Sequence, residues 1–95
     1  MNTEAIAVPK FQLGRIVSTS NALNRLTQED ILLGIARHQA GDWGEVGEED
    51  RQENELSLKT SFRLFSVYRS ANGVTFWIIT EANRSLTTVL LPKDY

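Results

Sequence analysis

The chain has 95 residues, of which 41% are hydrophobic and 23% are charged, and it has no cysteine. This composition is typical of one globular domain, and the lack of cysteine excludes disulfides, thiolate metal ligands and a cysteine nucleophile. No apolar run approaches the ~20 residues that span a bilayer, and the N-terminus lacks the pattern of a signal peptide, so we expect a soluble, cytoplasmic protein.

The net charge of −2 is divided unevenly along the chain. Residues 27–55 include nine acidic and two basic side chains, whereas the rest of the chain has three acidic and eight basic ones. Such a division is typical of a protein with one acidic and one basic face. The simpler interpretation, which we favour, is a solvated acidic helix that covers a sheet with scattered arginines.

The beginning of the chain predicts a loose start, one strand and a short helix. Residues 1–10 have no clear period and include Pro9, so we expect them to be loosely ordered. Residues 11–18 alternate in character, which predicts a strand, and Gly14 within them indicates a bulge or a close backbone approach. A run of N-cap residues at 18–21 then predicts a short helix.

A second helix is predicted from Thr27 onward. Its apolar residues recur at helical spacing, at Ile31, Leu32, Ile35 and Ala36. Thr27 and Asp30 have the spacing of a capping box, and early acidic residues suit the positive end of a helix. Gly41 lies where a C-terminal cap belongs, so we expect this helix to end there.

The rest of the chain predicts an exposed helix and three strands. Residues 48–59 are polar except for two leucines, which is typical of a helix that contacts the core along one edge. The strands are predicted at 62–69, 74–80 and 86–91. The Asn72–Gly73 pair between the first two is a strong hairpin signal. Because residues 74–80 are apolar on both faces, we expect that strand to be central and covered on both sides.

The order of one strand, three helices and three strands predicts an α+β fold with an antiparallel sheet of about four strands. We expect the N-terminal strand to join one edge of the C-terminal meander, and the helices to pack on one face. Residues 1–95 are treated as one domain. The two edges of such a sheet each offer a route to a homodimer.

Two segments carry a resemblance to a known group of proteins. They are GDWGEV at 41–46 and FWIITEANRSLTTVLLPKDY at 76–95, supported by residues 13–26, His38 and Asn54. In these segments the chain resembles small bacterial proteins found on plasmids and other mobile elements, usually labelled plasmid-related or hypothetical. The resemblance implies a bacterial accessory-gene setting and no mechanism. Most relatives have Asp where this chain has Asn83, so no role that needs a carboxylate there is implied.

The densest polar cluster beside the apolar strands is the turn at 80–85 together with Thr87 and Thr88. In a binding interpretation, Arg84 binds a phosphate or carboxylate and Glu81 orients it. In a structural interpretation, which we favour, Glu81 and Arg84 form an internal pair that fixes a tight turn.

His38 and the Asp42–Trp43 pair each allow two interpretations. His38 is either a general base oriented by Asp42 or a cation beside the negative end of its helix. Trp43 is either a surface anchor for a partner or a side chain that fills the core. We favour the structural interpretation in both cases. The sequence has no ligand spacing for a metal and no glycine-rich loop for a cofactor, so we expect neither.

The function that we favour from the sequence is a non-enzymatic protein-interaction module. Its binding surface would be an acidic helical face at Glu48, Glu49 and Asp50. Such a surface competes for sites that normally hold nucleic-acid phosphates, so it would modulate or inhibit a nucleic-acid-handling enzyme.

Two alternatives use the basic residues of the sheet. A small ribonuclease toxin would draw on Arg63, Arg69, Arg84, Tyr68 and Tyr95. A nucleic-acid-binding protein would use the arginines at 15, 63, 69 and 84, with bases stacked on Phe65, Trp77 or Tyr68. The negative net charge argues against the ribonuclease, because RNA binding normally needs a basic surface.

Overall fold

A computed structural model of the protein describes residues 8–95, so most of the predicted loose start, at 1–7, lies outside the described residues. The elements are β1 (Arg15–Ser18), α1 (Ser20–Arg25), α2 (Gln28–Gln39), α3 (Glu48–Thr60), β2 (Leu64–Arg69), β3 (Thr75–Thr80), β4 (Leu86–Leu90) and a short 3-10 helix, η1 (Pro92–Asp94). Their order is the predicted one, and the α+β class is confirmed.

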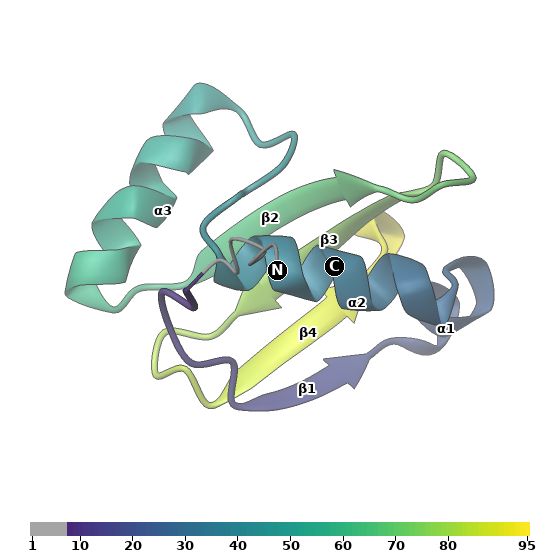
Figure 1. Ribbon diagram of the computed structural model, residues 1–95, viewed down its shortest axis with the longest axis horizontal. Helices are drawn as coiled ribbons and strands as arrows, with labels where there is room; N and C mark the ends of the chain where they lie inside the picture. Colours follow the sequence, from purple (N-terminus) through teal and green to yellow (C-terminus); the bar gives the residue numbers. More distant parts are fainter. Residues whose placement is uncertain (1–7) are drawn as a thin grey trace, which may run out of the picture.

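The sheet has the strand order β1-β4-β3-β2 and is mixed, not antiparallel as predicted. Strands β2, β3 and β4 form an antiparallel meander, and β1 joins it parallel to β4. The connections explain this direction. Helix α2 returns the chain to the end of the sheet where β1 began, so β2 runs the same way as β1 (Figure 1). The first and third strands of a meander are parallel, hence β4 also runs in the direction of β1.

Helix α2 lies across one face of the sheet (Figure 1). The predicted capping box at its start is confirmed: the Thr27 hydroxyl accepts from the Asp30 N–H, and the Asp30 carboxylate accepts from the Thr27 N–H, each at 3.0 Å. Gly34 faces the sheet, where a Cβ would lie 3.0 Å from the Phe76 ring, so a glycine permits this close approach. The core between helices and sheet contains Ala22, Leu26, Tyr68, Phe76, Ile78, Val89 and Leu91.

Helix α3 packs beside β2 and closes that edge of the sheet. The Asn54 carboxamide donates to the Phe65 carbonyl at 2.7 Å and accepts from the Phe65 N–H at 3.0 Å. Two residues further along β2, the Val67 N–H donates to the Trp43 carbonyl at 3.1 Å, and the Glu45 N–H donates to the Val67 carbonyl at 2.7 Å. The chain itself therefore uses the outward backbone groups of β2.

The predicted central position of β3 is confirmed, but its second face is covered only in part. Phe76 and Ile78 point toward the helices and are buried. Trp77 and Ile79 point to the opposite side, because side chains alternate along a strand. We call this side the outer face. Helix η1 and Tyr95 contact β3 there, and Trp77 remains partly exposed.

Candidate functional site

The outer face carries aromatic side chains around a hollow of about 250 Å³, which is lined by Arg63, Phe65, Trp77, Ile79 and Tyr95. We call these five residues the aromatic cluster. The rings of Phe65 and Trp77 meet edge to face with centroids 5.1 Å apart, and those of Trp77 and Tyr95 lie 5.7 Å apart. Strand pairing brings Phe65 opposite Ile79, so β2 and β3 hold the inner part of the cluster in a fixed arrangement.

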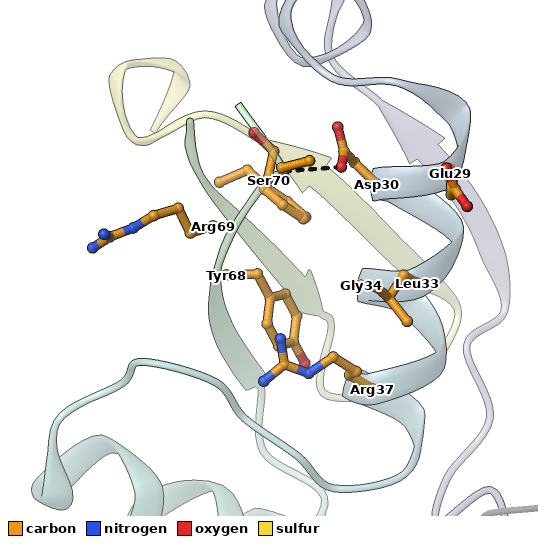
Figure 2. A pocket seen from close by; sticks show the side chains of 10 residues that line it. Glu29, Asp30, Leu33, Gly34, Arg37, Tyr68, Arg69 and Ser70 are labelled. Carbon is orange, nitrogen blue, oxygen red and sulfur yellow. Dashed lines mark hydrogen bonds between the residues drawn. The ribbon is translucent and has the colours of Figure 1, made fainter. Parts of the chain in front are cut away.

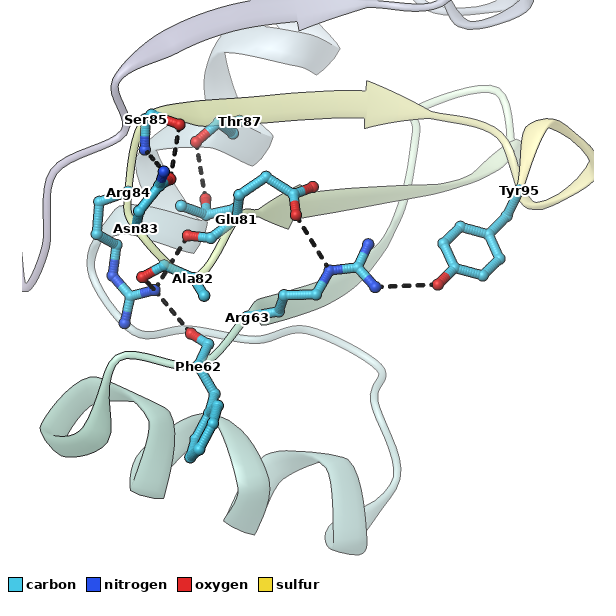
Figure 3. Close-up of polar contacts among 10 residues, drawn as sticks. Phe62, Arg63, Glu81, Ala82, Asn83, Arg84, Ser85, Thr87 and Tyr95 are labelled. Atoms are coloured by element: carbon cyan, nitrogen blue, oxygen red, sulfur yellow. Dashed lines mark hydrogen bonds and ion pairs between the residues drawn. The ribbon is translucent and has the colours of Figure 1, made fainter.

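Within the aromatic cluster, Arg63 lies between Glu81 and Tyr95 and contacts both (Figure 3). Its Nη1 donates to the Tyr95 hydroxyl at 3.0 Å, and its guanidinium carbon lies 5.7 Å from the centre of the Tyr95 ring. Its Nε lies 3.5 Å from the Glu81 carboxylate. The hydrogen bond with Tyr95, together with the charge of Glu81, raises the pKa of Arg63. The predicted pairing of Glu81 with Arg84 is therefore wrong, because the Glu81 carboxylate faces Arg63 instead.

Arg84 holds three segments together through backbone carbonyls (Figure 3). Its guanidinium donates to the carbonyls of Ser57, Phe62, Glu81 and Ala82, at 2.9, 2.7, 3.2 and 3.1 Å. The φ angle of Arg84 is 62°, in the left-handed region that non-glycine residues rarely adopt, so these contacts also stabilise a strained turn. Arg84 thus fixes the turn as the structural interpretation expects, although through carbonyls and not through the Glu81 side chain.

Thr87 and Thr88 lie on opposite faces of β4, so the structure does not bring them together at the turn. Thr88 is on the outer face, partly exposed. Thr87 is fully buried on the helix side, where its hydroxyl donates to the Leu13 carbonyl at 2.7 Å and lies 2.7 Å from the Thr80 hydroxyl.

His38 continues this buried polar network, and it has no exposed surface. Its Nδ1 lies 2.5 Å from the Ser66 hydroxyl and its Nε2 lies 2.9 Å from the Thr80 hydroxyl. Burial, with a smaller contribution from the charge of Arg84, lowers the pKa of His38 to about 3. Neither predicted role is supported: a substrate has no access to the imidazole, and a neutral ring provides no charge for the helix end.

Trp43 fills the core, as the structural interpretation predicts. It is 4% exposed, and its indole N–H donates to the Glu55 carboxylate at 2.8 Å. The neighbouring Asp42 accepts two hydrogen bonds from Arg37, at 2.7 and 3.2 Å, which lower the pKa of the Asp42 carboxyl. Trp43 is therefore no surface anchor, and Arg37 already engages the Asp42 carboxylate.

The predicted acidic face is the exposed first turn of α3, with Glu48, Glu49 and Asp50. Arg51 donates to Glu48 at 2.9 Å through its Nε, and hydrogen bonds from Arg51 and then Gln52 lower the pKa of Glu48 to about 2. These exposed carboxylates make the first turn of α3 a negative surface.

A second hollow of about 320 Å³ lies between α2 and β2, with Gly34, Tyr68 and Phe76 among its lining residues (Figure 2). Its polar groups make contacts within the chain. The Arg37 guanidinium carbon lies 4.7 Å from the centre of the Tyr68 ring, and the Asp30 carboxylate accepts from the Ala71 N–H at 3.3 Å. Burial raises the pKa of Tyr68, whose hydroxyl donates to the Asp42 carbonyl.

The sequence analysis named several members of the aromatic cluster as candidates, but it did not predict that they lie together around one hollow. Arg63 and Phe65, which the nucleic-acid alternative uses, both line the hollow on the outer face. Tyr68, proposed as a stacking residue, is buried on the opposite face. The place of Tyr95 was missed because it depends on η1, which turns the chain back over β3. The polar network around His38 was also missed, although serine and threonine at core-facing strand positions are a signal for it.

Comparison of the chain with protein-family models, with curated proteins and with solved structures gave no match. Within residues 8–95, no helix has the length and apolar character needed to cross a bilayer. In the same part of the chain, no three side chains of His, Cys, Asp or Glu gather as metal ligands would. The candidate site is therefore supported by the geometry of its residues.

Proposed function

We propose that the protein is a non-enzymatic interaction module of a bacterial mobile element, and that it binds another protein through the aromatic cluster. The observation that carries the proposal is the grouping of Trp77, Tyr95 and Arg63 around a hollow on a face that α1, α2 and α3 leave uncovered within residues 8–95. Tyr95 is 72% exposed. Trp, Tyr and Arg dominate binding hot spots, because each buries a large surface and retains a polar group. The strands beneath already order the cluster, which lowers the entropic cost of binding.

The acidic first turn of α3 supports a partner with a basic surface. The helix that carries these carboxylates packs through Asn54 against Phe65 of β2, a member of the aromatic cluster. Charges at the rim of an interface increase the association rate and select the partner more than they increase affinity. An enzyme that handles nucleic acids has a basic surface of this kind, and its inhibition is the activity that we favour.

Direct nucleic-acid binding is the weaker candidate, because the chain already engages three of the four sheet arginines, all but Arg15. The Nε of Arg63 lies 3.5 Å from the Glu81 carboxylate, and the Nη2 of Arg69 lies 3.2 Å from the Glu45 carboxylate. Arg84 donates to backbone carbonyls. Each phosphate contact would compete with one of these interactions, whereas nucleic-acid affinity normally comes from unpaired basic groups. The ribonuclease is weaker again, since the chain's only histidine is buried.

The proposal is tested by capturing partners from a nuclease-treated bacterial lysate and then measuring the affinity of the purified partner. Tyr95→Ala is the informative variant, because the side chain is exposed and its loss leaves the core intact. Leu32→Ala is the matched control, since Leu32 is 58% exposed and lies on α2, away from the outer face. We expect Tyr95→Ala to weaken binding about tenfold or more, and Leu32→Ala to leave it unchanged.

Charge reversal of Glu48, Glu49 and Asp50 is expected to slow association and to reduce its salt dependence. A partner that binds Tyr95→Ala and the wild type equally well would refute the aromatic cluster as the binding surface. The nucleic-acid alternative would be favoured if partners are captured only from a lysate that was not treated with nuclease. It would also require that the protein shifts single-stranded nucleic acid in an electrophoretic assay at low salt.

A further inference from the structure

The two edges of the sheet differ in their backbone groups. At the β2 edge, Asn54 and the segment from Trp43 to Glu45 take the outward N–H and C=O groups of Phe65 and Val67. That edge is closed to another strand. The opposite edge is β1, which pairs with β4 on its inner side.

The outward groups of β1 follow from its pairing with β4. The Arg15 N–H donates to the Ser85 carbonyl and the Thr19 N–H donates to the Val89 carbonyl, each at 3.0 Å. Odd-numbered residues of β1 thus turn their backbone toward β4, and Ile16 and Ser18 turn theirs away. Within residues 8–95, neither Ile16 nor Ser18 has a backbone partner on that side. Ile16 is also 46% exposed.

The length of the extended segment selects one antiparallel register with a second copy. Gly14 has a φ of +64° and ends the extended segment before β1, and α1 begins at Ser20. Only Ile16 and Ser18 are therefore available for pairing. If Val17 lies on the twofold axis, Ile16 of each copy exchanges both backbone hydrogen bonds with Ser18 of the other. A register centred on Ile16 or on Ser18 leaves the other residue unpaired.

The charges beside β1 complement each other in this register. Arg15 of one copy lies directly opposite Thr19 of the other, and the Thr19 hydroxyl donates to the Asp94 carboxylate at 2.6 Å. Arg15 is exposed and forms no ion pair within residues 8–95. The pairing brings its guanidinium within reach of Asp94 of the other copy, and the twofold axis repeats this contact.

We infer that the β1 edge binds a second copy of this chain, as an antiparallel β1–β1 pair with Arg15 facing Asp94 across the dimer. The interface is small, because only Ile16 and Ser18 of each copy pair. We therefore expect monomer and dimer to interconvert, with the dimer fraction rising with protein concentration. A twofold axis perpendicular to the sheet joins the two sheets and turns both outer faces to the same side. The dimer therefore presents two aromatic clusters, and a partner with two binding sites gains avidity from it.

The test is the mass in solution, measured by analytical ultracentrifugation over a range of concentrations. The chain has a mass of 10.7 kDa, and we expect the average mass to rise toward twice this value. Ser18→Pro removes an outward N–H but no bond to β4, so it is expected to abolish the rise. Ser18→Ala is the matched control and keeps the dimer. Arg15→Glu places two carboxylates together and is expected to raise the dissociation constant about tenfold, with the difference shrinking in high salt.

Circular dichroism and thermal melts verify that each variant is folded, and Arg15→Glu decides the question if Ser18→Pro does not fold. A mass that stays at that of one chain at the highest concentration overturns the inference. A dimer that Arg15→Glu leaves unchanged overturns it as well, because another surface then joins the copies. Tyr95→Ala is expected to lose partner binding but to dimerise like the wild type. A failure of the dimer inference can therefore be distinguished from a failure of the proposed function.

Discussion

The burial of His38 predicts that mild acid destabilises the protein through one group. Its pKa is about 3 in the folded chain, against 6.5 for an unperturbed histidine. The unfolded state therefore takes up a proton as the pH falls below 6.5, while the folded state does not. Stability is complete above that value and declines as the pH falls toward 3. Linkage gives a loss of about 2 kcal/mol between pH 7 and pH 5.

This pH window isolates the histidine. His38 is the only histidine in the chain. The carboxyls with lowered pKa start from 3.8 at Asp30, Asp42 and Asp94 and from 4.5 at Glu48, so they remain largely ionised in both states down to pH 5 and reduce stability mainly in stronger acid. The decline in stability between pH 7 and pH 5 is thus expected to come almost entirely from His38.

Urea unfolding at pH 7, 6 and 5, followed by tryptophan fluorescence, measures this effect. The wild type is expected to lose about 2 kcal/mol across the series. His38→Gln removes the titrating group, so its stability, although lower, is expected to stay constant over the same range. NMR of the single imidazole gives a direct reading, with no titration expected above about pH 4. A midpoint near 6.5 in the folded protein, or a wild-type stability that does not change with pH, would refute the reasoning.

Three further substitutions test backbone contacts, and Gly73→Ala is the control for the first of them; each is measured by urea unfolding. Gly44→Ala places a Cβ 2.0 Å from the Val67 carbonyl oxygen and is expected to cost more than about 3 kcal/mol, whereas Gly73→Ala meets open space and costs only the ~1–2 kcal/mol of a left-handed residue. Asn54→Leu leaves two backbone groups of β2 unpaired, with an expected loss of about 2–4 kcal/mol, and an unchanged midpoint would contradict this role. Arg84→Lys cannot reach all the carbonyls that Arg84 holds and is expected to cost about 1–3 kcal/mol; equal stability would show that the turn needs only a charge.

Local signals in the sequence predicted the elements, because each depends on neighbouring residues. The capping box at Thr27 depends on Asp30, three residues away. The Asn72–Gly73 pair predicts the β2–β3 hairpin, and Gly73 has the positive φ that such a turn needs, 82°. The direction of β1 was not predictable in this way, because it depends on how α2 carries the chain back across the sheet. The role of Arg84 also depends on distant segments, since its acceptors include the Ser57 carbonyl in α3.

The two faces of the sheet distribute polar and aromatic side chains in an unusual way. The buried face carries Ser66 and Thr80, which are hydrogen-bonded to His38 of α2, and within residues 8–95 no buried side-chain polar atom lacks a partner. Burial of these groups adds little stability, because their hydrogen bonds only offset the loss of water. Trp77 and Tyr95, which would stabilise a core far more, remain partly or largely exposed on the outer face. Folding stability alone does not account for this placement, whereas a protein partner that covers the aromatic cluster would bury the same rings on binding.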